Sequence, residues 1–222
     1  MTRLLMLVEG QSEEIFVNQT LAPHLAEHGV YVDPILLWTK RLPSGGGFRG
    51  GTSNWRQIQK SLIPLTRDGN AWVTTLLDFY GLPEDVPGYE EALRPGDPRE
   101  RVMALEACMA AEIRHQRFIP FLALHEFEAW VFCDAEVLAK HFDRADLSEK
   151  VAQAIAIAGE PELINHGKDT HPKARLQAMA TGYKETSDGP TLLSKIGIPA
   201  IRTACPHFAA WLDRLEALGQ GV

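Results

Sequence analysis

Short apolar runs alternate with amphipathic segments over the first 133 residues of the chain. An unbroken apolar run without polar alternation is typical of a strand that is buried on both faces of a parallel sheet. Leu4–Val8 is such a run. Three further strands are predicted over Tyr31–Trp38, which Pro34 breaks near its start, Ala71–Leu77 and Phe118–Leu124.

The amphipathic segments between these runs predict helices. The first helix is expected to begin near Ser12 as its N-cap, with Glu13 in the first turn, where the helix dipole favours an acid. Two more helices are expected over Asn54–Thr66 and Arg99–Gln116. This alternation predicts an α/β fold with a mainly parallel, Rossmann-like sheet of four strands, flanked by helices and joined by right-handed crossovers.

The pattern becomes mostly helical from Asp134 onward. Within this part, Ile198–Arg202 is the segment that we expect to form a short final strand, and His207–Leu218 predicts a closing amphipathic helix. The sequence has no internal repeat and no long polar linker. We therefore expect one structural unit. It consists of an α/β core, residues 1–133, and a helical C-terminal extension, residues 134–222, that packs on the core.

The composition narrows the class of protein. With 222 residues and 45% hydrophobic content, the chain can bury one sizeable core, and its three scattered cysteines favour a reducing compartment. We expect a cytoplasmic protein without a membrane span, because no stretch approaches the roughly 20 apolar residues of a membrane helix. A net charge of −7 disfavours broad coating of nucleic acid, although a carboxylate metal site is compatible with it.

Acidic residues follow three of the four predicted strands. Glu9 comes after the first, Asp78 after the third, and Glu126 and Glu128 after the fourth. In open parallel sheets, ligands bind outside the carboxyl ends of the strands, and carboxylate oxygens there can hold Mg²⁺ or Mn²⁺ for phosphodiester chemistry. We expect Asp78 and Glu126 to be metal ligands, Glu9 a ligand or general base, and Glu128 a further ligand. The competing interpretation is that each acid only caps a helix or lies in a loop.

Basic residues in two regions are candidates for binding nucleic-acid phosphates. Arg41 and Arg49 flank or lie within a glycine-rich loop, whose ending lacks the Gly-Lys-Ser/Thr of a P-loop. The best basic patch of the C-terminal region consists of Lys168, Lys173, Arg175 and Lys184, with His171 and Tyr183 nearby as candidates to stack a base. The alternatives are a solvent loop for the first region and a solvated helix face for the second.

Several segments resemble known motifs. VEGQSEE, which contains Glu9, resembles the first Toprim motif, a hydrophobic strand that ends in Glu-Gly, and LLDFYGLP, which contains Asp78, resembles the second. Together with HEFEAWVF, HPKARL and CPHFAAWL, they resemble the bacterial DUF4276 family, which is regarded as Toprim-like and as distantly similar to the Toprim domains of OLD-type nucleases. The similarity extends over nearly the whole chain.

The resemblance implies roles for particular residues. The Glu that matches Glu9 serves proton transfer or metal binding, the acids that match Asp78 hold metal, and Lys173 is a catalytic candidate because it falls in HPKARL. The chain departs from the usual Asp-x-Asp of the second motif, since Tyr80 stands where the second Asp would be. A complete metal site then needs Glu126 or Glu128 as the replacement ligand.

These observations predict a Mg²⁺- or Mn²⁺-dependent nuclease of DNA or RNA. Toprim domains act on phosphodiesters, and the chain has little room for the further domains of a topoisomerase or primase, which favours hydrolysis. Relatives of this kind often sit beside ATPases in phage-defence systems, so an ATPase partner and a defence role are expected, and the hydrophobic C-terminal helix suggests a homodimer. The alternatives are a catalytically silent Toprim-like module that binds a partner protein or nucleic acid, and a phosphotransfer enzyme that acts on small molecules.

Overall fold

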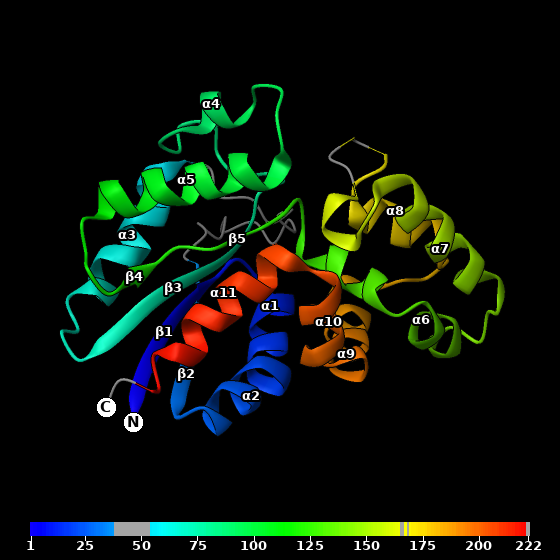
Figure 1. The fold of residues 1–222 in the computed structure, drawn as a ribbon, viewed down its shortest axis with the longest axis horizontal. Coiled ribbons are helices and arrows are strands. Elements are labelled where there is room, and N and C mark those ends of the chain that lie inside the picture. The colour runs from blue at the N-terminus through cyan, green and yellow to red at the C-terminus, as the bar shows by residue number, and fades with distance from the viewer. Residues whose placement is uncertain (38–53, 165–166, 168, 221–222) are drawn as a thin grey trace, which may run out of the picture.

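The sheet of this protein is entirely parallel among the residues that a computed structural model describes, which are 1–37, 54–164, 167 and 169–220 (Figure 1). Its order is β2-β1-β3-β4, and β5 also pairs with β3. The strands are β1 (Thr2–Val8), β2 (Val30–Leu36), β3 (Ala71–Asp78), β4 (Phe118–Ile119) and β5 (Leu122–Ala123). This architecture, a parallel sheet flanked by helices, confirms the predicted fold class.

The fourth predicted strand is divided into β4 and β5 by Pro120. Proline has no N–H to donate to the ladder, so pairing with β3 is interrupted at this point. Two threonine side chains of β3 replace the missing bonds. The Thr74 hydroxyl donates to the Ile119 carbonyl at 2.6 Å, and the Thr75 hydroxyl both donates to the Phe121 carbonyl and accepts from its N–H, each at 2.8 Å.

Helices cover both faces of the sheet. Alternate residues of β1 point to opposite faces, as the strand geometry requires: Leu4, Met6 and Val8 belong to one buried cluster, and Leu5 and Leu7 to the other. On the second face lie α3 (Trp55–Thr66), α4 (Tyr89–Ala92) and α5 (Pro98–Ile113), whereas α1 (Gln11–Phe16), α2 (Ala22–Glu27) and α11 (Pro206–Ala217) cover the first (Figure 1).

The first helical segment differs from its prediction in two respects. Gly10, not Ser12, is the N-cap, and its N–H donates to the Glu13 carboxylate at 2.9 Å. The segment also contains a π-helical turn, Val17–Leu21, between α1 and α2. Leu21 and Val17 are fully buried in this turn, so the wider helix still presents apolar side chains to the sheet.

The remaining elements are helical and lie mostly beyond the carboxyl end of the strands (Figure 1). They are a 3₁₀ segment η2 (Phe127–Cys133), α6 (Ala135–His141), α7 (Asp146–Ala158), a 3₁₀ turn η3 (Pro161–Leu163), α8 (Pro172–Met179), α9 (Glu185–Ile196) and α10 (Ile198–Ala204). The strand predicted at Ile198–Arg202 is wrong, because this segment is α10. Pro199 lies in its first turn, where proline favours a helix, and Ile198 and Ile201 are buried with helical spacing.

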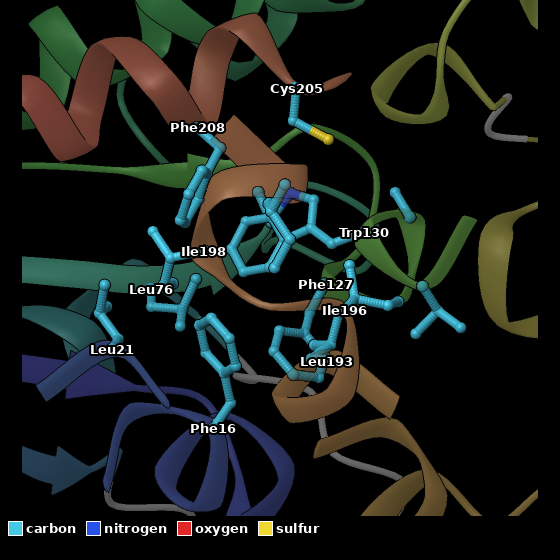
Figure 2. Close-up of a cluster of buried hydrophobic side chains, with 14 of the residues drawn as sticks. Phe16, Leu21, Leu76, Phe127, Trp130, Leu193, Ile196, Ile198, Cys205 and Phe208 are labelled. Atoms are coloured by element: carbon cyan, nitrogen blue, oxygen red, sulfur yellow. The ribbon is translucent and has the colours of Figure 1, made fainter. Parts of the chain in front are cut away.

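One core joins residues that are far apart in the sequence. Phe16 from α1, Trp130 from η2, Leu193 from α9 and Phe208 from α11 meet in the same buried cluster (Figure 2). The rings of Phe208 and Trp130 are 4.7 Å apart in an edge arrangement. The segment that follows β5 is therefore held from several sides, which fixes the backbone that carries Glu126 and Glu128. No helix in the described ranges is both long and apolar enough to cross a membrane.

Candidate metal centre

Three strand ends bring the predicted acids together. β1 and β3 are parallel neighbours with Val8 opposite Leu76, so Glu9 and Asp78 leave the sheet at the same edge. Asp78 is in turn paired with Ala123 of β5, three residues before Glu126. The parallel register thus explains why residues that are distant in the sequence share one site.

Two of these carboxylates also hold the surrounding backbone. A Glu9 carboxylate oxygen accepts from the Asp78 N–H at 3.2 Å, and Asp78 Oδ1 accepts from the Phe127 N–H at 2.8 Å. Each carboxylate therefore fixes the segment that carries the next acid of the site. Glu9, Asp78 and the segment after β5 are therefore linked by two hydrogen bonds, the second of which also caps the first residue of the helical segment that begins at Phe127.

The turn after β5 aims two further acids at the same place. His125 has a φ of 71°, in the left-handed region, and its carbonyl accepts from the Tyr80 N–H at 2.7 Å. Glu126 then precedes η2, and Glu128 lies in its first turn. One oxygen each from Asp78, Glu126 and Glu128 lie within 4.8 Å of one another. Glu126 and Glu128 are 3% and 2% exposed, so these two members of the cluster are shielded from water, whereas Asp78 is half-buried.

Glu126 is held by the start of α8. Its Oε2 accepts from the Lys173 backbone N–H at 2.9 Å and pairs with His171 Nδ1 at 2.7 Å. The His171 ring is stacked on Tyr80, with ring centroids 4.5 Å apart and an interplanar angle of 17°. Tyr80, which stands where the resemblance expects a second Asp, therefore supports the imidazole that orients Glu126.

Burial and mutual repulsion make these acids hard to ionise. Burial, and then the charge of Glu13, raises the pKa of Glu9 to about 7. Burial also raises the pKa of Glu128 to about 8, although the positive charge of Lys173 acts in the opposite direction. The pKa of Asp78 lies well above its ordinary value, because the residue is buried and Glu9, Glu13 and Glu128 are close to it. Like charges gathered in a water-poor place favour either protons or a bound cation.

The donor set fits a hard divalent ion. Only carboxylate oxygens form the cluster of Asp78, Glu126 and Glu128, and such oxygens are the ligands that Mg²⁺ and Mn²⁺ prefer. Glu128 Oε1 is buried and has no hydrogen-bond partner in the described structure. An unpaired buried carboxylate oxygen is costly, and a cation placed among these three residues removes that cost.

The predicted basic residues have different surroundings. Lys173 Nζ pairs with Glu185 at 2.9 Å, and its pKa is raised, because the charges of Glu128 and Glu185 outweigh the effect of burial. The exposed Lys184 precedes α9, and its backbone N–H donates to Asp188 at 2.7 Å. Arg41, Arg49 and Lys168 lie outside the described residues.

Three residues near the acids were not predicted as members of the metal site, although Tyr183 was a candidate for stacking a nucleic-acid base. Glu13 is buried, and its pKa is raised chiefly by burial. Its position in VEGQSEE was visible in the sequence, but an acid in a first helical turn has an ordinary explanation in the helix dipole. Tyr183 has a buried hydroxyl without a hydrogen-bond partner among the described residues, and Glu185 pairs with Lys173. No spacing in the sequence relates these two residues to the strand ends.

Comparison with known proteins identifies a family and one group of similar structures. The family described as "Domain of unknown function (DUF4276)" matches residues 8–216, and no curated protein matches the chain. Three solved structures of the C-terminal region of the Xanthomonas campestris pv. campestris OLD protein are similar over nearly the whole of both chains. The mercury-phased structure has 18% identity, a TM-score of 0.36 and coverage of 99% of this chain and 98% of that chain.

The other two structures of that region give similar values. The iodine-phased structure has 16% identity, a TM-score of 0.33 and coverage of 100% and 99% of the two chains. The platinum-phased structure has 16% identity, a TM-score of 0.34 and coverage of 99% and 96%. These TM-scores describe a weak likeness.

Proposed function

The chain belongs to the DUF4276 family, and we propose that it is a divalent-metal-dependent nuclease that hydrolyses phosphodiester bonds in DNA or RNA. One observation carries the proposal: Asp78, Glu126 and Glu128 each direct a carboxylate oxygen to one place at the carboxyl end of a parallel sheet, within 4.8 Å of one another, and Glu126 and Glu128 are buried there. Such carboxylate clusters hold the ions that assist displacement at phosphorus.

Asp78, Glu126 and Glu128 are the residues that we assign to hold Mg²⁺ or Mn²⁺. When bound, the ion supplies a Lewis acid for a phosphate oxygen and lowers the pKa of a water molecule. The protein supplies orientation. The His171 imidazole and the Lys173 N–H fix the Glu126 carboxylate, and the Phe127 N–H fixes Asp78, so that these ligands lose little rotational freedom on binding.

Glu9 is the residue that we assign to proton transfer. A general base is most effective when its pKa lies near the working pH, and the pKa of Glu9 is about 7 because the side chain is buried next to Glu13. Lys173 is 27% exposed and carries the positive charge that acts on the acids, so we assign it to the phosphate of the substrate. Binding of that phosphate requires exchange of its ion pair with Glu185.

The proposed ligand set accounts for the departure at Tyr80. The turn at His125 places Glu126 and Glu128 beside Asp78, which supplies the further carboxylates that a second Asp would otherwise provide. The proposal therefore does not need an acid at position 80. The resemblance to Toprim-like proteins supports the same chemistry.

The test is cleavage of labelled single- and double-stranded DNA and RNA in the presence of Mg²⁺, Mn²⁺ or EDTA. The variants are Asp78→Asn, Glu126→Gln and Glu9→Gln, which keep side-chain volume and remove the charge. The matched control is Glu112→Gln, an exposed acid on α5. We expect metal-dependent cleavage that falls by at least about a hundredfold in the three site variants and is unchanged in the control. Cleavage that survives all three substitutions would contradict the proposed site.

The competing function is a catalytically silent module that binds a partner protein or nucleic acid. The observation that favours it is Lys173, whose positive charge lowers the pKa of Glu9, Glu13 and Glu128 and so partly replaces a metal ion. The two functions differ in Mg²⁺ binding. A chain that neither binds Mg²⁺ nor cleaves, alone or with an ATPase partner of the kind that the resemblance implies, would be the silent module.

A further inference from the structure

A second group of metal-ligating side chains lies at the opposite end of the sheet from the acidic cluster. His24 and His28 are one helical turn apart at the end of α2, and Glu216 comes from α11. One ligand atom from each of the three lies within 4.8 Å of the others. The two chain ends meet here, since the Thr2 hydroxyl donates to the Leu218 carbonyl at 2.9 Å (Figure 1).

The geometry converges on one carboxylate oxygen. Glu216 Oε1 lies 2.7 Å from His24 Nε2 and 3.7 Å from His28 Nε2. The side chain of Glu216 is 9% exposed, whereas those of His24 and His28 are 22% and 35% exposed. The site is therefore anchored by a buried acid, and its two imidazoles reach the surface, where an ion can enter.

The donor atoms differ in chemistry from those of the acidic cluster. His24 lies in α2 and His28 is the residue that caps its C-terminus, and their ring centroids are 5.1 Å apart. Two imidazoles at this separation can bind the same ion, and a carboxylate completes a set of three protein ligands. Imidazole is suited to Zn²⁺, Ni²⁺ and Cu²⁺, and it is a poor ligand for Mg²⁺. A set of three ligands leaves a coordination position for water or another donor.

The surrounding charges permit a cation. Arg202 donates from Nη1 to Glu216 Oε1 at 3.0 Å, and its Nη2 donates to Asp213. With neutral histidines, Glu216 and Asp213 contribute two negative charges and Arg202 one positive charge, which leaves a net charge of −1. Arg202 keeps its partner Asp213 if an ion takes over Glu216.

We propose that His24, His28 and Glu216 form a binding site for a divalent transition-metal ion of the imidazole-binding class, with Zn²⁺ as its representative. The ion ties α2 to α11 across 192 positions of the sequence. Because α11 covers the sheet through Trp211, which stacks on Phe121 at 4.1 Å, binding at this site stabilises the attachment of the C-terminal helix. The site is independent of the proposed nuclease function.

The test uses the full chain, stripped with EDTA and titrated with Zn²⁺ in the presence of excess Mg²⁺, which occupies oxygen-only sites. The variants are His24→Gln and His28→Gln, both at partly exposed positions, with His115→Gln as the histidine control. Every protein in the comparison, the parent chain included, carries Cys133→Ser. The reason is that the sulfur atoms of Cys133 and Cys205 are 3.3 Å apart and thiolates also bind Zn²⁺.

We expect one equivalent of Zn²⁺ to bind to the parent chain and to raise the midpoint of thermal unfolding. Each ligand variant should lose at least about tenfold in affinity, since even outer-shell changes cost about 10–100-fold. The control should match the parent in affinity and in midpoint. Equal Zn²⁺ affinity in His24→Gln, His28→Gln and the control would overturn the proposal, and so would a parent chain that binds no Zn²⁺ in excess Mg²⁺.

Discussion

Replacing Glu128 by glutamine should stabilise the protein in the absence of divalent metal, and only at neutral and alkaline pH. Glu128 is 2% exposed, its Oε1 has no hydrogen-bond partner among the described residues, and burial raises its pKa from 4.5 to about 8. In the unfolded chain this carboxyl loses its proton near pH 4.5. Folding at a higher pH therefore requires either uptake of a proton or burial of a charge, and both cost free energy.

The sign and the size of the effect follow from proton linkage. Below pH 4.5 the carboxyl is protonated in both states and has no electrostatic cost. Between pH 4.5 and about 8 the folded state binds the extra proton, so stability falls as pH rises, and above pH 8 the loss is complete. At about 1.4 kcal/mol for each pKa unit, the full loss is roughly 5 kcal/mol. Glutamine carries no charge and avoids this loss.

The measurement is urea unfolding in EDTA between pH 5 and 9, followed by tryptophan fluorescence. We expect the free-energy advantage of Glu128→Gln to grow by roughly 3–5 kcal/mol between these limits. The value near pH 5 reports how well the amide is accommodated, so the change with pH isolates the charge. Glu112→Gln, an exposed substitution on α5, should show no such change. A stability difference for Glu128→Gln that is constant with pH would refute the reasoning.

Two further predictions concern the acidic cluster. The affinity for Mg²⁺, measured by calorimetry, should rise as the pH increases from 6 to 9. Glu9 and Glu128 have pKa values of about 7 and about 8, so the protons that they hold at lower pH compete with the ion. An affinity that is independent of pH would contradict the assigned cluster. Tyr80→Ala should weaken Mg²⁺ binding by about tenfold, because His171 loses the ring that it stacks on, whereas Tyr80→Phe should bind like the parent chain. Equal losses in both Tyr80 variants would show that the hydroxyl, not the stacking, matters.

The sheet and the position of its acids could be predicted because their signals are local. Each strand is a short apolar run, and Glu9 and Asp78 stand directly at the ends of such runs. Once the strands are parallel neighbours, their carboxyl ends must meet, so no long-range information is needed to place these residues together. Reliance on local signals also explains the wrong prediction of a strand at Ile198–Arg202. A short apolar run has no local feature that distinguishes a strand from a buried helix.

Contacts between distant segments could not be predicted in this way. The spacing of His24 and His28 in the sequence does not by itself indicate a metal site. Only the packing of α11 on the first face of the sheet brings Glu216 close to them. The same packing brings the sulfur atoms of Cys133 and Cys205 to 3.3 Å, although the sequence shows only scattered cysteines. In both cases tertiary packing determines which distant residue becomes the neighbour, Glu216 for the histidines and Cys205 for Cys133. Such packing produces no periodic pattern in the sequence.

The residue at position 80 shows why a motif comparison along the chain underestimates the site. In the sequence, Tyr80 occupies the position at which the resemblance to the second Toprim motif predicts an Asp, so one expected carboxylate is absent. In the structure, the left-handed turn at His125 places Glu126 and Glu128 beside Asp78, and the Tyr80 ring supports the His171 imidazole that holds Glu126. The aromatic residue therefore supports Glu126, one of the carboxylates that we assign to the proposed metal site, and this contact depends on neighbours in space that are distant in the sequence.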